Sequence, residues 1–182
     1  MAKDGDERVR LEDYDPAWVG LFEKEVAALV EVLGEHVVGG LHHVGSTAVP
    51  GLKAKPVIDI MVGVRDLESS RGCIEMVAGL DYLYAPYRTD VMHWFCKPDP
   101  RRRTHHLHLV PVGSERFRDV LAFRDYLRSG PEVARRYEEL KVELAARFAD
   151  DRDAYTEGKS ALVAEMTAEA RAVAIKRSGA RD

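Results

Sequence analysis

The sequence predicts an α+β fold, in which a mixed β-sheet is flanked by helices and the C-terminal half is helical. Three observations carry this prediction. Apolar side chains recur at helical spacing over residues 15–33, and residues 57–62 form the short apolar run that is typical of a buried strand. Helical periodicity then resumes after residue 113 and continues to the end of the chain.

The first expected element is a helix that begins at Asp15-Pro16, because aspartate caps a helix N-terminus and proline fits its first position. Gly34 is expected to end this helix. Its apolar residues are expected to form one buried stripe, which comprises Trp18, Leu21, Phe22, Val26, Leu29, Val30 and Leu33. A strand over residues 40–44 and, after a Gly-Ser turn, a second strand over 57–64 are expected to follow.

The middle of the chain is expected to contain one helix and three strands. Asp66 can cap a helix over residues 67–78, which Gly79 would end. The three strands are expected at residues 82–87, 91–97 and 104–111, with a hairpin loop between the last two. Beyond them, breaks in the helical region are expected near residues 129–131 and 150–151.

Composition limits the class of protein. The 182 residues suffice for one domain, expected to be ordered over residues 10–175 and frayed before residue 10. A net charge of −4 gives no field that favours nucleic acid. The two cysteines form no disulfide framework, and no leader segment or apolar run of about 18 residues is present. A cytoplasmic protein that neither spans a membrane nor binds nucleic acid is therefore expected.

The strongest functional signal lies at residues 43–60, with the sequence HVGSTAVPGLKAKPVIDI. Gly45 lets the backbone approach a ligand, and Ser46 can cap a short helix whose amide groups point outward. Asp59 is a charge inside an apolar strand, where an unpaired carboxylate is costly. It therefore needs a partner, either a metal or phosphate site or, alternatively, backbone groups and a basic residue at the strand end.

The same segment supplies the candidate phosphate contacts. Gly45, Ser46 and Thr47 are the best of them, and Lys55 is a second-line contact that can equally be a solvated surface lysine. His43 can orient Ser46 or touch a phosphate, and it can equally pack at the end of a strand. The segment therefore predicts a pocket for a nucleotide or another phosphate-bearing small molecule.

A second signal lies in the sequence His105-His106-Leu107-His108-Leu109. Side chains alternate along a strand, so His106 and His108 share one face and the leucines share the other. Two imidazoles at this spacing can bind one metal or one phosphate, and the alternative is two polar side chains on a wet strand face. Together with Asp59 they would make a set that suits Mn²⁺, Fe²⁺ or Zn²⁺ better than Mg²⁺.

The helical half offers two further basic candidates. Arg124 follows Phe123, which pairs with Leu127 four residues on to face the core. Lys141 lies one turn after Tyr137, and such a pair can bind phosphate or can join one helix to the next. For Arg124 the alternatives are a wall of the pocket and an ion pair on the helix surface.

The 43–60 segment resembles the GrpB family, a branch of the nucleotidyltransferase-like proteins. Four other regions resemble the same family, and together they span residues 10–175. They are LEDYDPAWVGLFEKE, HHLHLV, FRDYLR, and YEELKVELAARF with the later YTEGKSALV. The resemblance implies a nucleotidyltransferase-like fold in which a Gly-Ser turn faces strand acids that hold a divalent metal and a nucleotide. It also marks Arg124 as a wall residue of the pocket.

The resemblance implies a metal-assisted transfer of a nucleotidyl or other phosphate-linked group to a small acceptor, with Asp59, His106 and His108 as catalytic and metal-binding residues and Mg²⁺, Mn²⁺ or Zn²⁺ as the ion. One departure from the pattern is clear. The second strand acid, two residues from Asp59, is replaced by Met61. This leaves two alternatives open: a non-catalytic nucleotide-binding accessory domain, like those joined to dephospho-coenzyme A kinase, and a metal-dependent phosphoester hydrolase.

Overall fold

A five-stranded sheet is the centre of the fold, in the order β1-β2-β5-β4-β3. The computed structural model describes residues 7–179. The strands are β1 (Leu41–Val44), β2 (Ile58–Val64), β3 (Leu83–Tyr84), β4 (His93–Pro98) and β5 (Arg103–Pro111). β2 and β5 run parallel, whereas the other neighbouring pairs are antiparallel. The sheet is therefore mixed, and the expected α+β class is confirmed.

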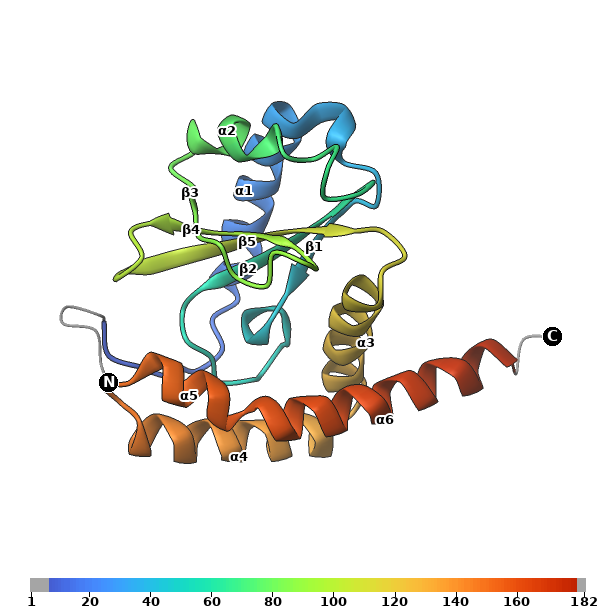
Figure 1. Cartoon of the computed structure of the whole chain (residues 1–182). Coiled ribbons are helices and arrows are strands. Elements are labelled where there is room, and N and C mark those ends of the chain that lie inside the picture. Colours follow the sequence, from blue (N-terminus) through green and yellow to red (C-terminus); the bar gives the residue numbers. More distant parts are fainter. Residues whose placement is uncertain (1–6, 180–182) are drawn as a thin grey trace.

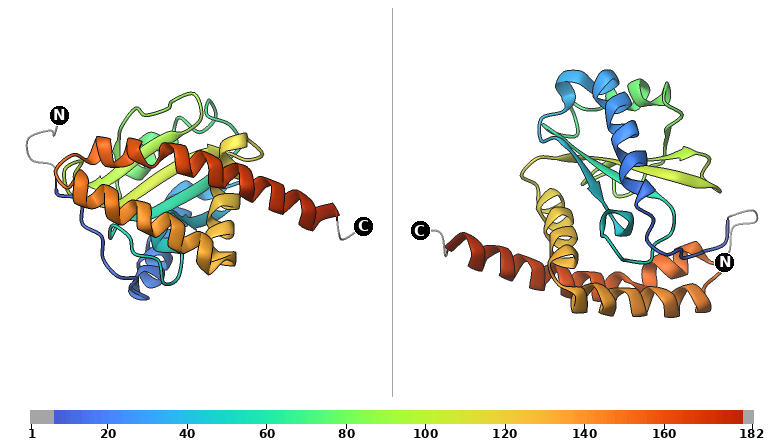
Figure 2. Two further views of the ribbon diagram at one scale, coloured as in Figure 1. Left: turned by 90° about the horizontal axis from the view of Figure 1, so that it is seen from below. Right: turned by 180° about the vertical axis from the view of Figure 1, so that it is seen from behind.

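Helices cover both faces of this sheet. They are α1 (Ala17–Leu33), α2 (Cys73–Ala78), α3 (Glu115–Ser129), α4 (Pro131–Arg147), α5 (Arg152–Gly158) and α6 (Ser160–Gly179), with short 3₁₀ turns η1 (Gly34–His36) and η2 (Ser46–Ala48). α1 and α2 lie on one face, and α3 to α6 lie on the other (Figure 1). Seen from below, α4 and α6 run side by side across the sheet (Figure 2). Within residues 7–179, no helix is long and apolar enough to cross a membrane.

Alternation along the central strands separates two environments. Ile58, Ile60 and Val62 of β2 are buried in a core with α1 and α2. Met61 points to the opposite face, where it packs in a second cluster with Phe117 and other residues of α3. An odd-numbered position on β2 therefore faces α3 to α6, and this is what places a polar side chain of β2 beneath the C-terminal helices.

The start of α1 agrees with the sequence, but its buried stripe does not. Asp15 accepts a hydrogen bond from the Ala17 amide at 2.8 Å, as expected of a cap. Leu21 and Val30, predicted to be buried, are 46% and 47% exposed. Glu25 is buried instead, because its carboxylate meets Lys97 of β4 at 2.5 Å. The ion pair thus fixes the rotation of α1 over the sheet.

Two expected elements are shorter than predicted. The helix expected over residues 67–78 begins only at Cys73. The preceding turns are stabilised locally, since Asp66 accepts from the Ser69 amide at 2.7 Å and the Ser70 hydroxyl donates to the Asp66 carbonyl. The strand expected at 82–87 comprises only the two residues of β3, because Pro86 has no amide hydrogen to continue the pairing.

The two ends of the described chain also differ from the sequence prediction. Residues 7–10, expected to be frayed, are held in place: the Val9 amide donates to the Ala149 carbonyl at 2.7 Å, and Val9 is buried. The other residues that were expected to be frayed, 1–6, and the last three residues of the region expected to be helical, 180–182, lie outside the described residues. Both expected helix breaks are confirmed, and a further break at Lys159 separates α5 from α6.

Candidate metal centre

Two neighbouring parallel strands bring Asp59, His106 and His108 together. In the register of β2 and β5, Asp59 lies opposite His106 and Met61 lies opposite His108. The Asp59 carboxylate oxygen Oδ1 is 2.8 Å from His106 Nδ1 and 3.6 Å from His108 Nε2. One ligand atom from each residue lies within 4.8 Å of the other two. The convergence expected from the strand pattern is therefore present.

Both kinds of ligand are held in the charge state that metal binding requires. Burial alone would raise the pKa of Asp59, but the hydrogen bonds and charges of His106 and His108 lower it well below its usual range. Burial lowers the pKa of His106, and the Asp59 carboxylate opposes this only in part. An ionised carboxylate and a neutral imidazole are the forms that donate electron pairs to a metal.

The donor set indicates the kind of ion that fits. Two imidazole nitrogens and one carboxylate oxygen suit a transition metal such as Mn²⁺ or Zn²⁺ better than they suit Mg²⁺. Nε2, the second nitrogen of His106, is buried and has no hydrogen-bond partner among residues 7–179. No hydrogen bond from these residues therefore occupies Nε2. The His106 ring is oriented by its contact with Asp59 and by Trp94, whose ring centre is 5.1 Å away.

Gly45 lies against the carboxylate. Its φ of 70° and ψ of −172° belong to a region that is essentially limited to glycine. A Cβ at this position would stand 2.2 Å from Asp59 Oδ2. The Gly-Ser turn therefore packs directly on the candidate metal ligand, and glycine is required there for both its conformation and its lack of a side chain.

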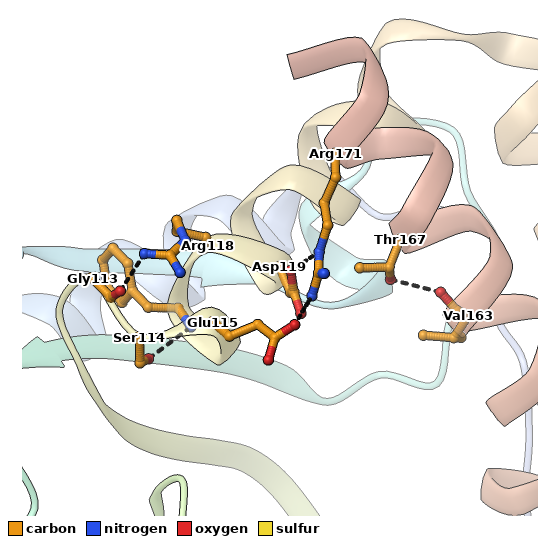
Figure 3. A network of polar contacts seen from close by, with 9 residues as sticks. Gly113, Ser114, Glu115, Arg118, Asp119, Val163, Thr167 and Arg171 are labelled. Carbon is orange, nitrogen blue, oxygen red and sulfur yellow. Dashed lines mark hydrogen bonds and ion pairs between the residues drawn. The ribbon is translucent and has the colours of Figure 1, made fainter. Parts of the chain in front are cut away.

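The cluster opens into a cavity of about 460 Å³ between the sheet and the C-terminal helices. Asp59, His108, Met61 and Gly45 line one side of this cavity. The other side is formed by α3, α4 and α6, and Arg171 of α6 is joined there to Asp119 and Glu115 of α3 (Figure 3). A cavity of this size holds a small organic ligand.

A group of lysines, Lys55, Lys141 and Lys159, lies beside the Gly-Ser turn; we call it the lysine cluster. Lys141 is 1% exposed and donates to the Ser46 hydroxyl at 3.3 Å and to the Lys53 carbonyl. Lys55 and Lys159 both lie over the Tyr155 ring, at 5.3 Å and 4.4 Å from its centre. Ser46 and Lys141, two of the candidate phosphate contacts from the sequence, are therefore in direct contact, and Lys55, a third, lies with Lys159 over the same ring.

The charges of the lysine cluster affect one another. Burial lowers the pKa of Lys55 to about 8 and the pKa of Lys141 to about 7, and the charge of Lys159 contributes to both shifts. Asp59 acts in the opposite direction on Lys55 and Lys159. An anion bound here would relieve the repulsion, so the region is suited to a phosphate group.

Of the candidates from the sequence, Gly45, Asp59 and His108 line the cavity, whereas three others stabilise the Gly-Ser turn. His43 pairs with Ile60 and stacks on Phe22 of α1, with 4.7 Å between the ring centres, so it lies on the opposite face of the sheet. Its Nε2 donates to Thr47, whose hydroxyl in turn donates to the Val57 carbonyl at 3.1 Å. His43 and Thr47 therefore fix the turn. Arg124 also stabilises the turn, because it donates to the His43 carbonyl at 3.2 Å. It pairs with Asp125 as well.

Replacing His43 with glutamine is expected to reduce the loss of stability in acid. Burial lowers the pKa of His43 to about 4, against about 6.5 in an unfolded chain. Below pH 6.5 the unfolded state binds the proton more readily, so wild-type stability falls as the pH falls toward 4. Between pH 7.5 and 5, preferential protonation of His43 in the unfolded state lowers the free energy of unfolding by about 2 kcal/mol. Urea unfolding at both pH values measures it; an equal loss in His43→Gln would contradict the assignment.

Sequence analysis missed Arg116, Asp119 and Arg171 in the wall of the cavity. A weak signal existed, since Arg116, Val120 and Phe123 are spaced to share one face of α3. For Lys159, its spacing of one turn from Tyr155 favoured a contact between helices, and its role in the lysine cluster was not predicted. That role depends on the break between α5 and α6, which places Lys159 over Tyr155.

Comparison with known proteins gives consistent matches. The family model described as GrpB protein matches residues 8–169. A UPF0157 protein of Pseudomonas aeruginosa is 38% identical over 88% of this chain and 67% of its own length. The UPF0157 protein YqkA of Bacillus subtilis is 33% identical over 80% of this chain and 42% of its own length. The chain therefore spans less than half of that relative.

A solved structure is also similar to this chain. The crystal structure of the conserved protein GrpB from Enterococcus faecalis superposes with a TM-score of 0.81 at 35% identity. The match covers 88% of this chain and 96% of the other. The arrangement of sheet and helices described above is therefore found in an experimentally determined relative.

Proposed function

The chain belongs to the GrpB family, and we propose that it is a metal-assisted transferase that moves a nucleotidyl or other phosphate-linked group to a small acceptor. One observation carries the proposal: Asp59, His106 and His108 form a two-histidine, one-carboxylate set, of which Asp59 and His108 line a cavity, and Lys141 is buried beside the adjoining Gly-Ser turn. A nucleotidyltransferase-like arrangement has these parts, with a Gly-Ser turn facing a strand acid. Transfer of phosphate-linked groups depends mainly on positioning and charge neutralisation, which such parts supply.

Asp59, His106 and His108 would hold a divalent metal. The ion would supply positive charge against the phosphate oxygens of the donor. The lysine cluster and the Ser46 hydroxyl would bind the remaining phosphate charge, with Lys141 oriented by Ser46 and the Lys53 carbonyl. Gly45 keeps the turn close to Asp59, so that metal and phosphate are held next to each other.

Nucleoside triphosphates are expected to stabilise the protein in the presence of Mn²⁺, Zn²⁺ or Mg²⁺. A ligand at 100 times its dissociation constant stabilises by about 2.7 kcal/mol, which a thermal shift detects readily. The shift should be lost in Asp59→Ala and kept in Asp90→Ala, a matched control in an exposed turn. No shift with any nucleotide and metal pair would overturn the proposal.

A second candidate function, a nucleotide-binding accessory domain without turnover, is favoured by Met61. This residue is 1% exposed and lines the cavity where a second metal-binding carboxylate would otherwise stand. Metal-dependent binding with no product, whatever the acceptor, would support it. Release of free phosphate or a nucleoside monophosphate without any acceptor would instead indicate a phosphoester hydrolase.

A further inference from the structure

Arg116 is a half-buried cation in the wall of the cavity, and no carboxylate of residues 7–179 forms an ion pair with it. It lies near the start of α3, and its Nε is buried without a hydrogen-bond partner among the described residues. A buried N–H donor is normally paired, because it loses its bonds to water on burial. A guanidinium that lines a cavity and has such an unpaired donor is therefore a candidate anchor for an anionic ligand.

Asp119, a carboxylate that lines the same cavity, already pairs with another arginine. Both oxygens of Asp119 accept hydrogen bonds from Arg171, from its Nε at 2.6 Å and from its Nη2 at 2.5 Å (Figure 3). Nη2 of Arg171 also donates to Glu115 at 2.6 Å. Arg171 thus links α6 to α3 with its charge neutralised, and the remaining guanidinium of the cavity wall is that of Arg116.

Apolar side chains also line the cavity. Those of the sheet are Val44, Met61 and Val110, and those of the helices are Val120, Phe123 and Val163. An apolar ligand body gains free energy by leaving water for such walls, while a few polar groups fix its orientation. The lining therefore combines apolar walls with the polar groups of Asp59, His108 and Arg116.

We propose that the cavity binds an organic acid with an apolar body, such as an aryl or alkyl carboxylic acid, whose carboxylate is held by Arg116. This inference rests on the proposed function, in which a hydroxyl or amino group on the apolar body of the acid would accept the transferred group. A guanidinium and a carboxylate match in shape and can form two parallel hydrogen bonds.

The charges around Arg116 favour a carboxylate over a phosphate at this end of the cavity. Arg88 acts on Arg116 as a positive charge, and Asp119 and Asp59 act on it as negative charges. These charges nearly cancel, so a monoanion leaves a smaller excess of negative charge than a dianion does. The lysine cluster provides the region of higher positive charge beside the turn. The two ends of the site thus differ in the anion they accept.

Three matched probes test the proposal by ¹⁹F NMR: 3-(4-fluorophenyl)propanoate, its neutral amide, and 4-fluorophenyl phosphate. The titrations use the whole chain in EDTA, without nucleotide, so that no metal contributes. We expect the acid to bind at least about tenfold more tightly than the amide or the phosphate, because the amide forms no charge-assisted pair and the phosphate brings a larger excess of negative charge. Equal affinities, tighter phosphate binding, or no binding of any probe would overturn the inference.

Variants on one helix locate the binding. Arg116→Ala should remove the preference for the acid over the amide, and Arg118→Ala should keep it, because Arg118 is exposed and donates to the Gly113 carbonyl (Figure 3). Ala168→Trp, which fills the cavity from α6, should block acid and amide alike. An acid preference that survives in Arg116→Ala contradicts the inference. Because no metal or nucleotide is present, such a failure would leave the metal-dependent nucleotide shift unaffected.

Discussion

Gly45→Ala is expected to lower the affinity for a divalent metal by about 100-fold, although Gly45 donates no ligand atom. Its Cβ would stand 2.2 Å from Asp59 Oδ2 and 2.9 Å from the carboxylate carbon, so the carboxylate has to move out of its present position. Loss of one ligand or of its orientation lowers metal affinity by about 100-fold. The backbone conformation adds a stability cost of about 1–3 kcal/mol, because the glycine region is strained for alanine.

Gly51→Ala is the control that separates the contact of the added Cβ with Asp59 from the strain in the backbone. Gly51 also has a positive φ, of 80°, but nothing lies within 4 Å of the Cβ that alanine would add. This control should lose stability and keep metal affinity, whereas Gly45→Ala should lose both. Calorimetric titration with Mn²⁺ and Zn²⁺, after circular dichroism has shown that both variants fold, makes the comparison. Wild-type affinity in Gly45→Ala would exclude Asp59 as a ligand.

The residues of the candidate metal centre could be predicted from the sequence because strand geometry is regular. Alternation alone puts His106 and His108 on one face, and a lone Asp59 in an apolar strand signals a charge that needs a partner. The same rule decides between the two alternatives for His43. Val44 pairs with Asp59, so His43 has to face the other side with Ile60, where it packs near the end of the strand.

The cavity and its lining could not be predicted from the sequence in the same way. An arginine near the start of a helix is normally solvated, and the part played by Arg116 follows only from the packing of α3 against α6. That packing depends on Arg171, which lies 52 residues beyond Asp119 in the chain. No local pattern encodes a contact of this kind, because it is decided by how the helices meet.

The largest loss of stability is expected from breaking the ion pair beneath α1. Glu25 and Lys97 have side chains only 11% and 17% exposed, and their charged atoms are 2.5 Å apart. Lys97 also lies 4.8 Å from the centre of the Tyr82 ring, and His105 Nε2 is 3.9 Å from Glu25. Lys97→Met leaves the Glu25 carboxylate buried without its partner, which costs about 3–5 kcal/mol.

Replacing both partners tests this explanation. Glu25→Leu with Lys97→Met removes both charges, and an apolar pair of similar volume should restore most of the stability that Lys97→Met loses. The exposed pair Arg8–Asp150, with side chains 68% and 69% exposed, is the matched control, and Asp150→Ala should change stability by less than about 1 kcal/mol. Equilibrium unfolding in urea gives all three values. If the double variant is no more stable than Lys97→Met, the loss comes from packing around the lysine stem, and α1 is oriented by its apolar contacts alone.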